Sequence, residues 1–154
     1  GARMTKKILK GLKYDNKTIE DIALLVEQHL RPHTFKMGWT DSAVRRYIVD
    51  AGHMLEDLNE LVRADVTTKN KTKAKEIYEN LDEMEKRIEE VKAKEELSKI
   101  RPALSGDEIM EHFNIQPGPK VGVIMKALYE QRINDGEVSK EDALKLAEET
   151  YKNL

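Results

Sequence analysis

The sequence predicts an all-α protein, a helical array with one long helix at about residues 70–100 and a small C-terminal tail of three helices. Apolar residues recur at intervals of three and four, which is the spacing of one face of an α-helix. The alternation of apolar and polar residues that is typical of strands is almost absent. Residues of the types that cap helices stand before most of the apolar runs. Together these patterns indicate helices along the whole chain.

The composition favours long helices with narrow apolar faces and excludes several classes of protein. Charged residues make up 36% of the 154 positions and hydrophobic residues 39%, whereas about a quarter is usual for charged residues. The chain has no cysteine, which excludes disulfides and thiolate metal sites. No run approaches the roughly 20 apolar residues of a membrane span. We therefore expect a cytoplasmic protein without a membrane partner.

The first strong helical pattern follows residues 1–4, which resemble the remnant of a protease-cleaved vector sequence and are left outside the fold prediction. Asn16 or Thr18 is predicted to open this helix. Pro32 is predicted to end or kink it, and residues 33–39 to form a loop. The apolar face of the helix comprises Ile19, Ile22, Ala23, Leu25, Val26 and Leu30.

Two shorter helices are predicted next. Thr40 or Asp41 is expected to cap the first of them, which closes near Gly52, and the other runs over about residues 53–65. Their apolar faces comprise Ala43, Val44, Tyr47 and Ile48 in the first helix and Met54, Leu55, Leu58, Leu61 and Val62 in the second.

The long helix is predicted to begin between Thr68 and Thr72 and to continue to about Ile100. Its apolar residues are spaced by four, three, four and three, as in a coiled coil. A helix of this length, about 45 Å, needs a neighbour, because one apolar stripe alone does not hold it in water. The seam is therefore also a candidate surface for a homodimer. It comprises Ile77, Leu81, Met84, Ile88 and Val91.

A domain boundary is predicted at Pro102, because a residue before proline is pushed out of the α region. Residues 1–103 would form a helical body, and residues 104–154 the three-helix tail. The tail opens with a capping box, in which Ser105 is followed by Glu108 three residues later. The next two helices are expected to start near Pro119 and Ser139.

A run of lysines at the start of the long helix is the best candidate for RNA contact that the residues alone provide. Lys69, Lys71, Lys73 and Lys75 follow one another with no acidic residue between Asp65 and Glu76. Cations at a helix start oppose the helix dipole, and a phosphate would relieve that conflict while using the free N–H groups. The alternative is a solvated lysine face.

A second phosphate candidate lies in the tail at residues 117–122. Pro119 just inside a helix start is preorganised, and Lys120 and the exposed N–H groups beside Gly118 could receive a phosphate. Tight packing of another helix across Gly118 and Gly122 is the alternative. Residues 104–154 carry 10 acidic residues against 6 basic ones, which counts against a simple grip on a polyanion there.

Two further sets of residues are candidates for a metal site. His29 and His33 are one helical turn apart, but two histidines are too few for a metal ion without further ligands. Asp65 lies at a helix C-terminus, where the dipole disfavours an acid. It is therefore expected to pair with an arginine or to be a former metal ligand. The chain contains no recognisable catalytic motif for nucleotidyl transfer or for ATP binding.

Three segments jointly resemble the C-terminal half of bacterial CCA-adding tRNA nucleotidyltransferases and related poly(A) polymerases that carry an HD-type helical domain. They are residues 39–47 (WTDSAVRRY), residues 61–70 (LVRADVTTKN), and GDEIM at 106–110 followed by PGPKVG at 117–122. The segments occur in the order and spacing of that family, and the resemblance covers residues 5–152.

The resemblance implies a helical body and tail that hold tRNA, while an N-terminal head that is missing here adds nucleotides with Mg²⁺, CTP and ATP. No cofactor is then expected in this chain. His29 and Asp65 would be vestiges of the HD-type region. Phosphate contacts are expected from Arg45, Arg46, Arg63, Lys69, Lys71, Lys73, Gly118 and Lys120.

Two rival hypotheses remain open from the sequence. One is a remnant of an HD-type metal-dependent phosphohydrolase built on His29 and Asp65, which a bound divalent ion would favour. The other is a structural dimerisation module that uses the seam at residues 77–91, which a concentration-dependent dimer without RNA affinity would favour.

Overall fold

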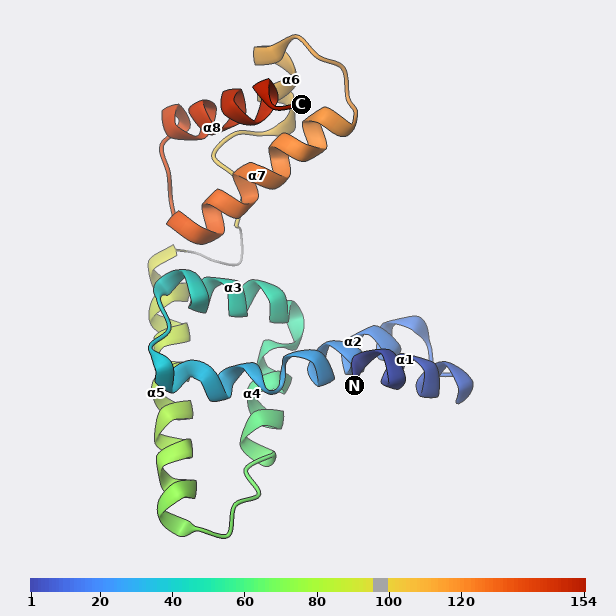
Figure 1. The fold of residues 1–154 in the computed structure, drawn as a ribbon, viewed down its shortest axis with the longest axis vertical. Coiled ribbons are helices and arrows are strands. Elements are labelled where there is room, and N and C mark those ends of the chain that lie inside the picture. Colours follow the sequence, from blue (N-terminus) through green and yellow to red (C-terminus); the bar gives the residue numbers. More distant parts are fainter. Residues whose placement is uncertain (96–99) are drawn as a thin grey trace. The chain divides into compact units, whose positions relative to one another are not determined.

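The computed structural model describes residues 1–95 and 100–154, and the regular elements in both ranges are helices (Figure 1). This confirms the predicted all-α class. By its contacts the chain divides into two units, Gly1–Glu90 and Val91–Leu154. The sequence placed the boundary later, between residues 103 and 104. The difference arises because the last turn of the long helix belongs with the second unit, where Arg132 Nη1 lies 3.2 Å from Glu95 Oε2.

The first unit begins with two helices that lie side by side, α1 (Ala2–Gly11) and α2 (Asn16–Gln28) (Figure 1). The sequence patterns did not predict α1, which buries none of its residues. The cap of α2 is Asp15 rather than Asn16 or Thr18. Its carboxylate accepts hydrogen bonds from the N–H of Thr18 at 3.0 Å and from the hydroxyl of Thr18 at 2.6 Å. An extended acidic residue three positions before a free N–H is a favoured N-cap.

The segment predicted as a loop at residues 33–39 is mostly a 3₁₀ helix, η1 (Arg31–Met37). Pro32 supports it, because proline fixes φ at a helical value in the first turn. The Thr34 hydroxyl donates to the Arg31 carbonyl at 2.8 Å and reinforces the turn. Gly38, with a φ of 86°, ends the element.

The next elements are α3 (Asp41–Ala51), the 3₁₀ turn η2 (Gly52–Met54) and α4 (Leu55–Ala64). Thr40 caps α3 as predicted, with its hydroxyl accepting from the N–H of Ala43 at 3.3 Å. The predicted apolar faces are largely confirmed, but Leu30 and Leu61 are exposed. Leu30 lies after the end of α2, where the helical period no longer holds.

The long helix α5 runs over Lys71–Glu95, which confirms the predicted start. The expected continuation to Ile100 falls partly on residues 96–99, which lie outside the described residues, and Ile100 itself is not helical. Four of the five seam residues are buried within this chain, since Leu81, Met84, Ile88 and Val91 are at most 3% exposed, whereas Ile77 is half-buried. Most of the face proposed for a homodimer is therefore already covered.

The second unit contains the predicted three-helix tail, formed by α6 (Gly106–Phe113), α7 (Pro119–Asp135) and α8 (Lys140–Lys152). The capping box is confirmed, since the Ser105 N–H donates to Glu108 Oε2 at 2.7 Å and the Glu108 N–H donates to Ser105 Oγ at 3.2 Å. The buried core of the tail comprises Leu104, Ile109, Ile124, Leu128, Ala143 and Ala147. In residues 1–95 and 100–154 no helix combines the length and apolar character needed to cross a membrane.

Candidate nucleic-acid interface

The lysine run lies at the N-terminus of α5 and is exposed. The side chain of Asn70 accepts the N–H of Lys73 at 3.1 Å and so provides the helix start. Lys69, Lys71 and Lys73 make no ion pair within the described ranges, whereas Lys75 pairs with Glu79 at 3.6 Å. The first turn of α5 contains no acidic residue. Three amino groups therefore stand at a helix start with no internal anion to offset their conflict with the dipole.

Two adjoining pockets lie between η1 and α5, and we call them together the η1–α5 groove. The larger has a volume of about 420 Å³ and the smaller about 250 Å³. Lys36 of η1 and Asn80 of α5 line both pockets, and Lys73 lines the smaller one, so the groove continues from the lysine run. From Lys73 to Arg87 the helix rises about 20 Å. The remaining lining residues are Pro32, His33, Phe35, Gly38, Trp39, Glu76, Ile77, Leu81, Glu83, Lys86 and Glu90.

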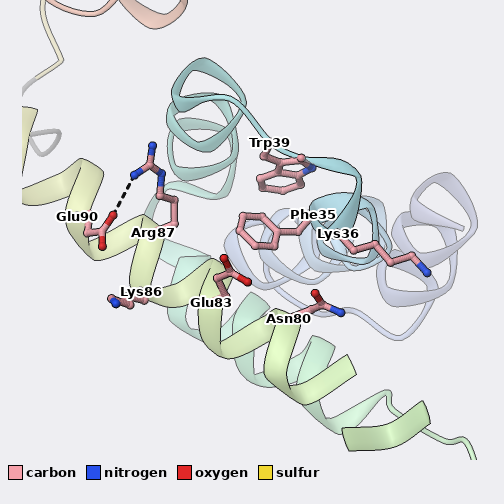
Figure 2. A pocket seen from close by; sticks show the side chains of 9 residues that line it. Phe35, Lys36, Trp39, Asn80, Glu83, Lys86, Arg87 and Glu90 are labelled. Atoms are coloured by element: carbon pink, nitrogen blue, oxygen red, sulfur yellow. Dashed lines mark hydrogen bonds and ion pairs between the residues drawn. The ribbon is translucent and has the colours of Figure 1, made fainter. Parts of the chain in front are cut away.

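One wall of the larger pocket is aromatic. Figure 2 shows Phe35 and Trp39 facing the turns of α5 that carry the polar lining residues. The two rings meet edge to face with centroids 5.7 Å apart, and the Trp39 indole N–H donates to Thr34 Oγ1 at 3.0 Å. Behind Trp39, the Tyr47 ring packs at 5.3 Å, and the Arg31 guanidinium lies 5.9 Å from the Trp39 ring centroid. Several independent contacts therefore fix the orientation of Trp39.

Tyr47 supports this wall as a buried, neutral phenol. Burial raises its pKa well above the usual value, and its hydroxyl donates to Asn59 Oδ1 at 2.8 Å. The Arg31 guanidinium also lies 5.7 Å from the Tyr47 ring centroid and pairs with Asp50 at 2.6 Å. Arg31 is thus held by an acid on one side and by two rings on the other.

The opposite wall, on α5, carries charges of both signs. Arg87 pairs with Glu90 at 3.0 Å and with Asp41, and the hydrogen bond to Glu90 is the main cause of its raised pKa (Figure 2). Lys86 and Glu83 make no ion pair in the part of the chain that the structure describes. The groove therefore offers both a free cation and a free carboxylate to a ligand.

The three predicted arginines are occupied by contacts within the chain. Arg63 on α4 donates from Nε and Nη2 to the Glu85 carboxylate at 3.0 and 2.8 Å and from Nη2 to Asp82 at 2.6 Å. The hydrogen bonds to Glu85 are the main cause of the raised pKa of Arg63. Arg45 is only 7% exposed, Arg46 is half-buried, and both interact with other residues. Their sequence positions gave no sign of this, because the acids that hold Arg63 lie about twenty residues further along the chain.

The candidate metal ligands His29, His33 and Asp65 do not form a metal-binding cluster with other described residues. His29 Nδ1 is 2.8 Å from the carbonyl of Val26, in the preceding turn of the chain, and His33 lines the smaller pocket. The expected ion pair of Asp65 with an arginine is not formed among the described residues, and Asp65 is exposed where α4 ends. Within residues 1–95 and 100–154, no three His, Asp or Glu side chains are arranged to hold a metal ion.

In the tail, Gly118 is the N-cap of α7 and Lys120 lies in its first turn. The Lys120 amino group is 5.3 Å from the ring centroid of Tyr151 on α8, and its side chain is exposed. The alternative of tight helix packing across the glycines is wrong. A Cβ on Gly122 would meet nothing within 4 Å, and one on Gly118 only the Gln116 carbonyl at 3.9 Å. The reason is that α7 buries its opposite face.

Comparison with known proteins gives a family match over nearly the whole chain. Residues 2–147 match the family model described as tRNA nucleotidyltransferase domain 2, putative. The chain is 32% identical over 143 residues to a CC-adding tRNA nucleotidyltransferase of Thermus thermophilus, covering 93% of this chain and 30% of that protein. It is 29% identical over 134 residues to an A-adding tRNA nucleotidyltransferase of Deinococcus radiodurans, covering 86% of this chain and 30% of that protein. No solved structure matches it significantly.

Proposed function

The chain belongs to the tRNA nucleotidyltransferase family, and we propose that it holds tRNA by backbone and shape for 3′-end addition by another part of a longer protein. It spans about 30% of the length of the curated relatives that it matches. The observation that carries the proposal is the lysine run, where Lys69, Lys71 and Lys73 are exposed and make no ion pair within residues 1–95 and 100–154. A tRNA backbone supplies the anions that this helix start lacks.

The electrostatic part of binding is assigned to the lysine run rather than to the arginines. Each phosphate that a lysine neutralises releases condensed counterions, which makes the affinity fall with salt. Arg63 is already held by two carboxylates, and a phosphate would have to compete with them. Its role in the proposal is to fix α4 against α5, so that the lysines are presented on a rigid edge.

The tail contributes position more than charge. Its surplus of acidic residues repels a long phosphate track, but Lys120 and Gly118 leave one exposed helix start on α7. Contacts of this kind fix register on a nucleic acid without reading bases, and double-stranded RNA is recognised mainly by shape and backbone.

The chemistry of nucleotide addition is assigned to the rest of the longer protein. Mg²⁺-dependent transfer from CTP or ATP needs carboxylates that hold metal ions, and the described residues contain no cluster of three acids or histidines suited to that. The donors among the described residues do not fit the metal that the resemblance implies, so no catalytic step is placed on them.

The proposal is tested by changing Lys69, Lys71 and Lys73 together to Glu and measuring tRNA binding across salt concentrations. Binding should weaken, and each lost phosphate contact should lower the slope of log affinity against log salt by somewhat under one unit. Thermal stability should stay level or rise, because acids suit a helix start. The matched control changes Lys7, Lys10 and Lys13 to Glu, which alters net charge equally on exposed positions elsewhere. Equal slopes for the wild type and the α5 variant would refute the proposal.

A further inference from the structure

The η1–α5 groove has the dimensions of a small-ligand site. Its larger pocket, of about 420 Å³, lies within the range of roughly 300–1,000 Å³ that is common for such sites. The smaller pocket adjoins it through Lys36 and Asn80. A ligand with two chemically different parts, one in each pocket, would therefore touch the same two residues in the middle.

The larger pocket presents aromatic rings to its opening. Phe35 and Trp39 are only half-buried, and stacking of bases on aromatic side chains is a main source of affinity for single-stranded nucleic acid. The hydrogen bond to Thr34 and the contacts with Tyr47 and Arg31 hold Trp39 in place. A wall that is already ordered loses little side-chain entropy when a planar ring packs against it.

The charged residues that line the groove favour a single nucleotide over the backbone of an RNA duplex. Lys36 and Lys73 line the smaller pocket from opposite elements and have no ion pair within the described ranges, which suits one phosphate. Glu76 and Glu83 both lie on the α5 wall of the groove, one in each pocket. They would repel a phosphate backbone that runs the length of the groove. A carboxylate does accept hydrogen bonds from the amino group of a base. The mixture fits a single nucleotide better than the edge of a duplex.

We propose that the η1–α5 groove binds one unpaired nucleotide of RNA, with its base against Phe35 and Trp39 and its phosphate between Lys36 and Lys73. The inference rests on the proposed function, since it takes RNA as the ligand, and it adds a defined site for single-stranded RNA. The base lies within reach of Asn80 and Glu83 on α5, which offer an amide and a carboxylate to its edge (Figure 2).

Trp39 is the only tryptophan of the chain, so its fluorescence reports directly on the groove. We would titrate the protein with a single-stranded RNA tetranucleotide and, separately, with a blunt RNA duplex that has no unpaired bases. The tetranucleotide should quench Trp39 and the duplex should not. Phe35→Leu should weaken tetranucleotide binding roughly tenfold, through the lost stacking of one base.

Two further variants control this experiment. Tyr78→Leu removes an exposed aromatic side chain from α5 that does not line the groove and should leave binding unchanged. Lys36→Gln changes an exposed residue that lines both pockets. It should weaken tetranucleotide binding even if Phe35→Leu fails to fold, as judged by circular dichroism.

Three results would overturn the inference: unchanged Trp39 fluorescence at saturating tetranucleotide, equal quenching by the duplex, or full tetranucleotide affinity in both groove variants. If tRNA binding still depends on Lys69 and Lys71 in that case, the groove inference fails and the proposed function stands. If the wild-type chain binds no tRNA at low salt, the proposed function fails as well.

Discussion

The two units of the chain use charge in opposite ways. In the first unit, Arg63 holds Asp82 and Glu85 in the middle of α5, while Lys69, Lys71 and Lys73 at the start of this helix make no ion pair with any described residue. In the second unit, an acidic side chain joins two helices through an ion pair. Glu108 accepts from Lys140 at 2.6 Å, and this hydrogen bond, together with those to Ser105, lowers the pKa of Glu108 to about 2.

The difference shows which charges are available to a ligand. A lysine that already has an acidic neighbour gives up that contact when it binds phosphate, whereas an unpaired lysine gives up only its hydration. The first unit keeps such lysines at a helix start and beside a groove. In the second unit, Lys140 and Arg132 are ion-paired within the chain. We therefore assign the electrostatic grip on RNA to the first unit.

A substitution in the core of the tail should cause a large loss of stability, and it tests whether the two units unfold separately. Leu128→Ala removes a side chain that is 1% exposed from the core of the tail and should destabilise that unit by about 2–5 kcal/mol. Thermal unfolding followed by circular dichroism should show an early transition for the tail, with the rest unfolding as before. A single transition shifted as a whole would mean that the two units fold as one.

A smaller loss of stability is expected when the contact between α4 and α5 is broken. Arg63→Ala leaves the carboxylates of Asp82 and Glu85 without their partner and should cost about 1–3 kcal/mol in denaturant unfolding, the usual range for hydrogen bonds between charged groups. Binding of tRNA should fall less than in the variant with three lysines changed, because Arg63 positions α5 rather than neutralising phosphate. A larger binding loss than that variant shows would reverse the assignment.

The smallest expected effect concerns the open face of α7. Gly122 lies in the interior of the helix with free space around it, so Gly122→Ala should stabilise the tail by about 0.5–1 kcal/mol. Binding of tRNA should not change, since a methyl group there blocks none of the lysines. Weaker tRNA binding in this more stable variant would show that a phosphate or another backbone approaches Gly122.

The helices and most of their ends could be predicted from the sequence alone. Apolar spacing identified the seam of α5, and local chemistry identified the caps at Thr40, Ser105 and Ser139, because each such signal lies within four residues of the group that it contacts. The same local logic missed Asp15, where a better cap stood one residue earlier. It also missed η1, since Pro32 and Gly38 are compatible with a loop and with a 3₁₀ turn.

Which charged residues are available to a ligand depends on the packing of the helices and could not be predicted from the sequence. Arg63 and Lys73 both look like phosphate ligands in the sequence, but Arg63 pairs with acids of α5, whereas Lys73 forms no ion pair in the described part of the chain. The aromatic wall of the groove was likewise invisible, because Phe35 and Trp39 face α5 across some forty residues of intervening chain. Helix propensity and capping act between near neighbours, whereas ion pairing and pocket formation depend on which distant helix faces are packed together.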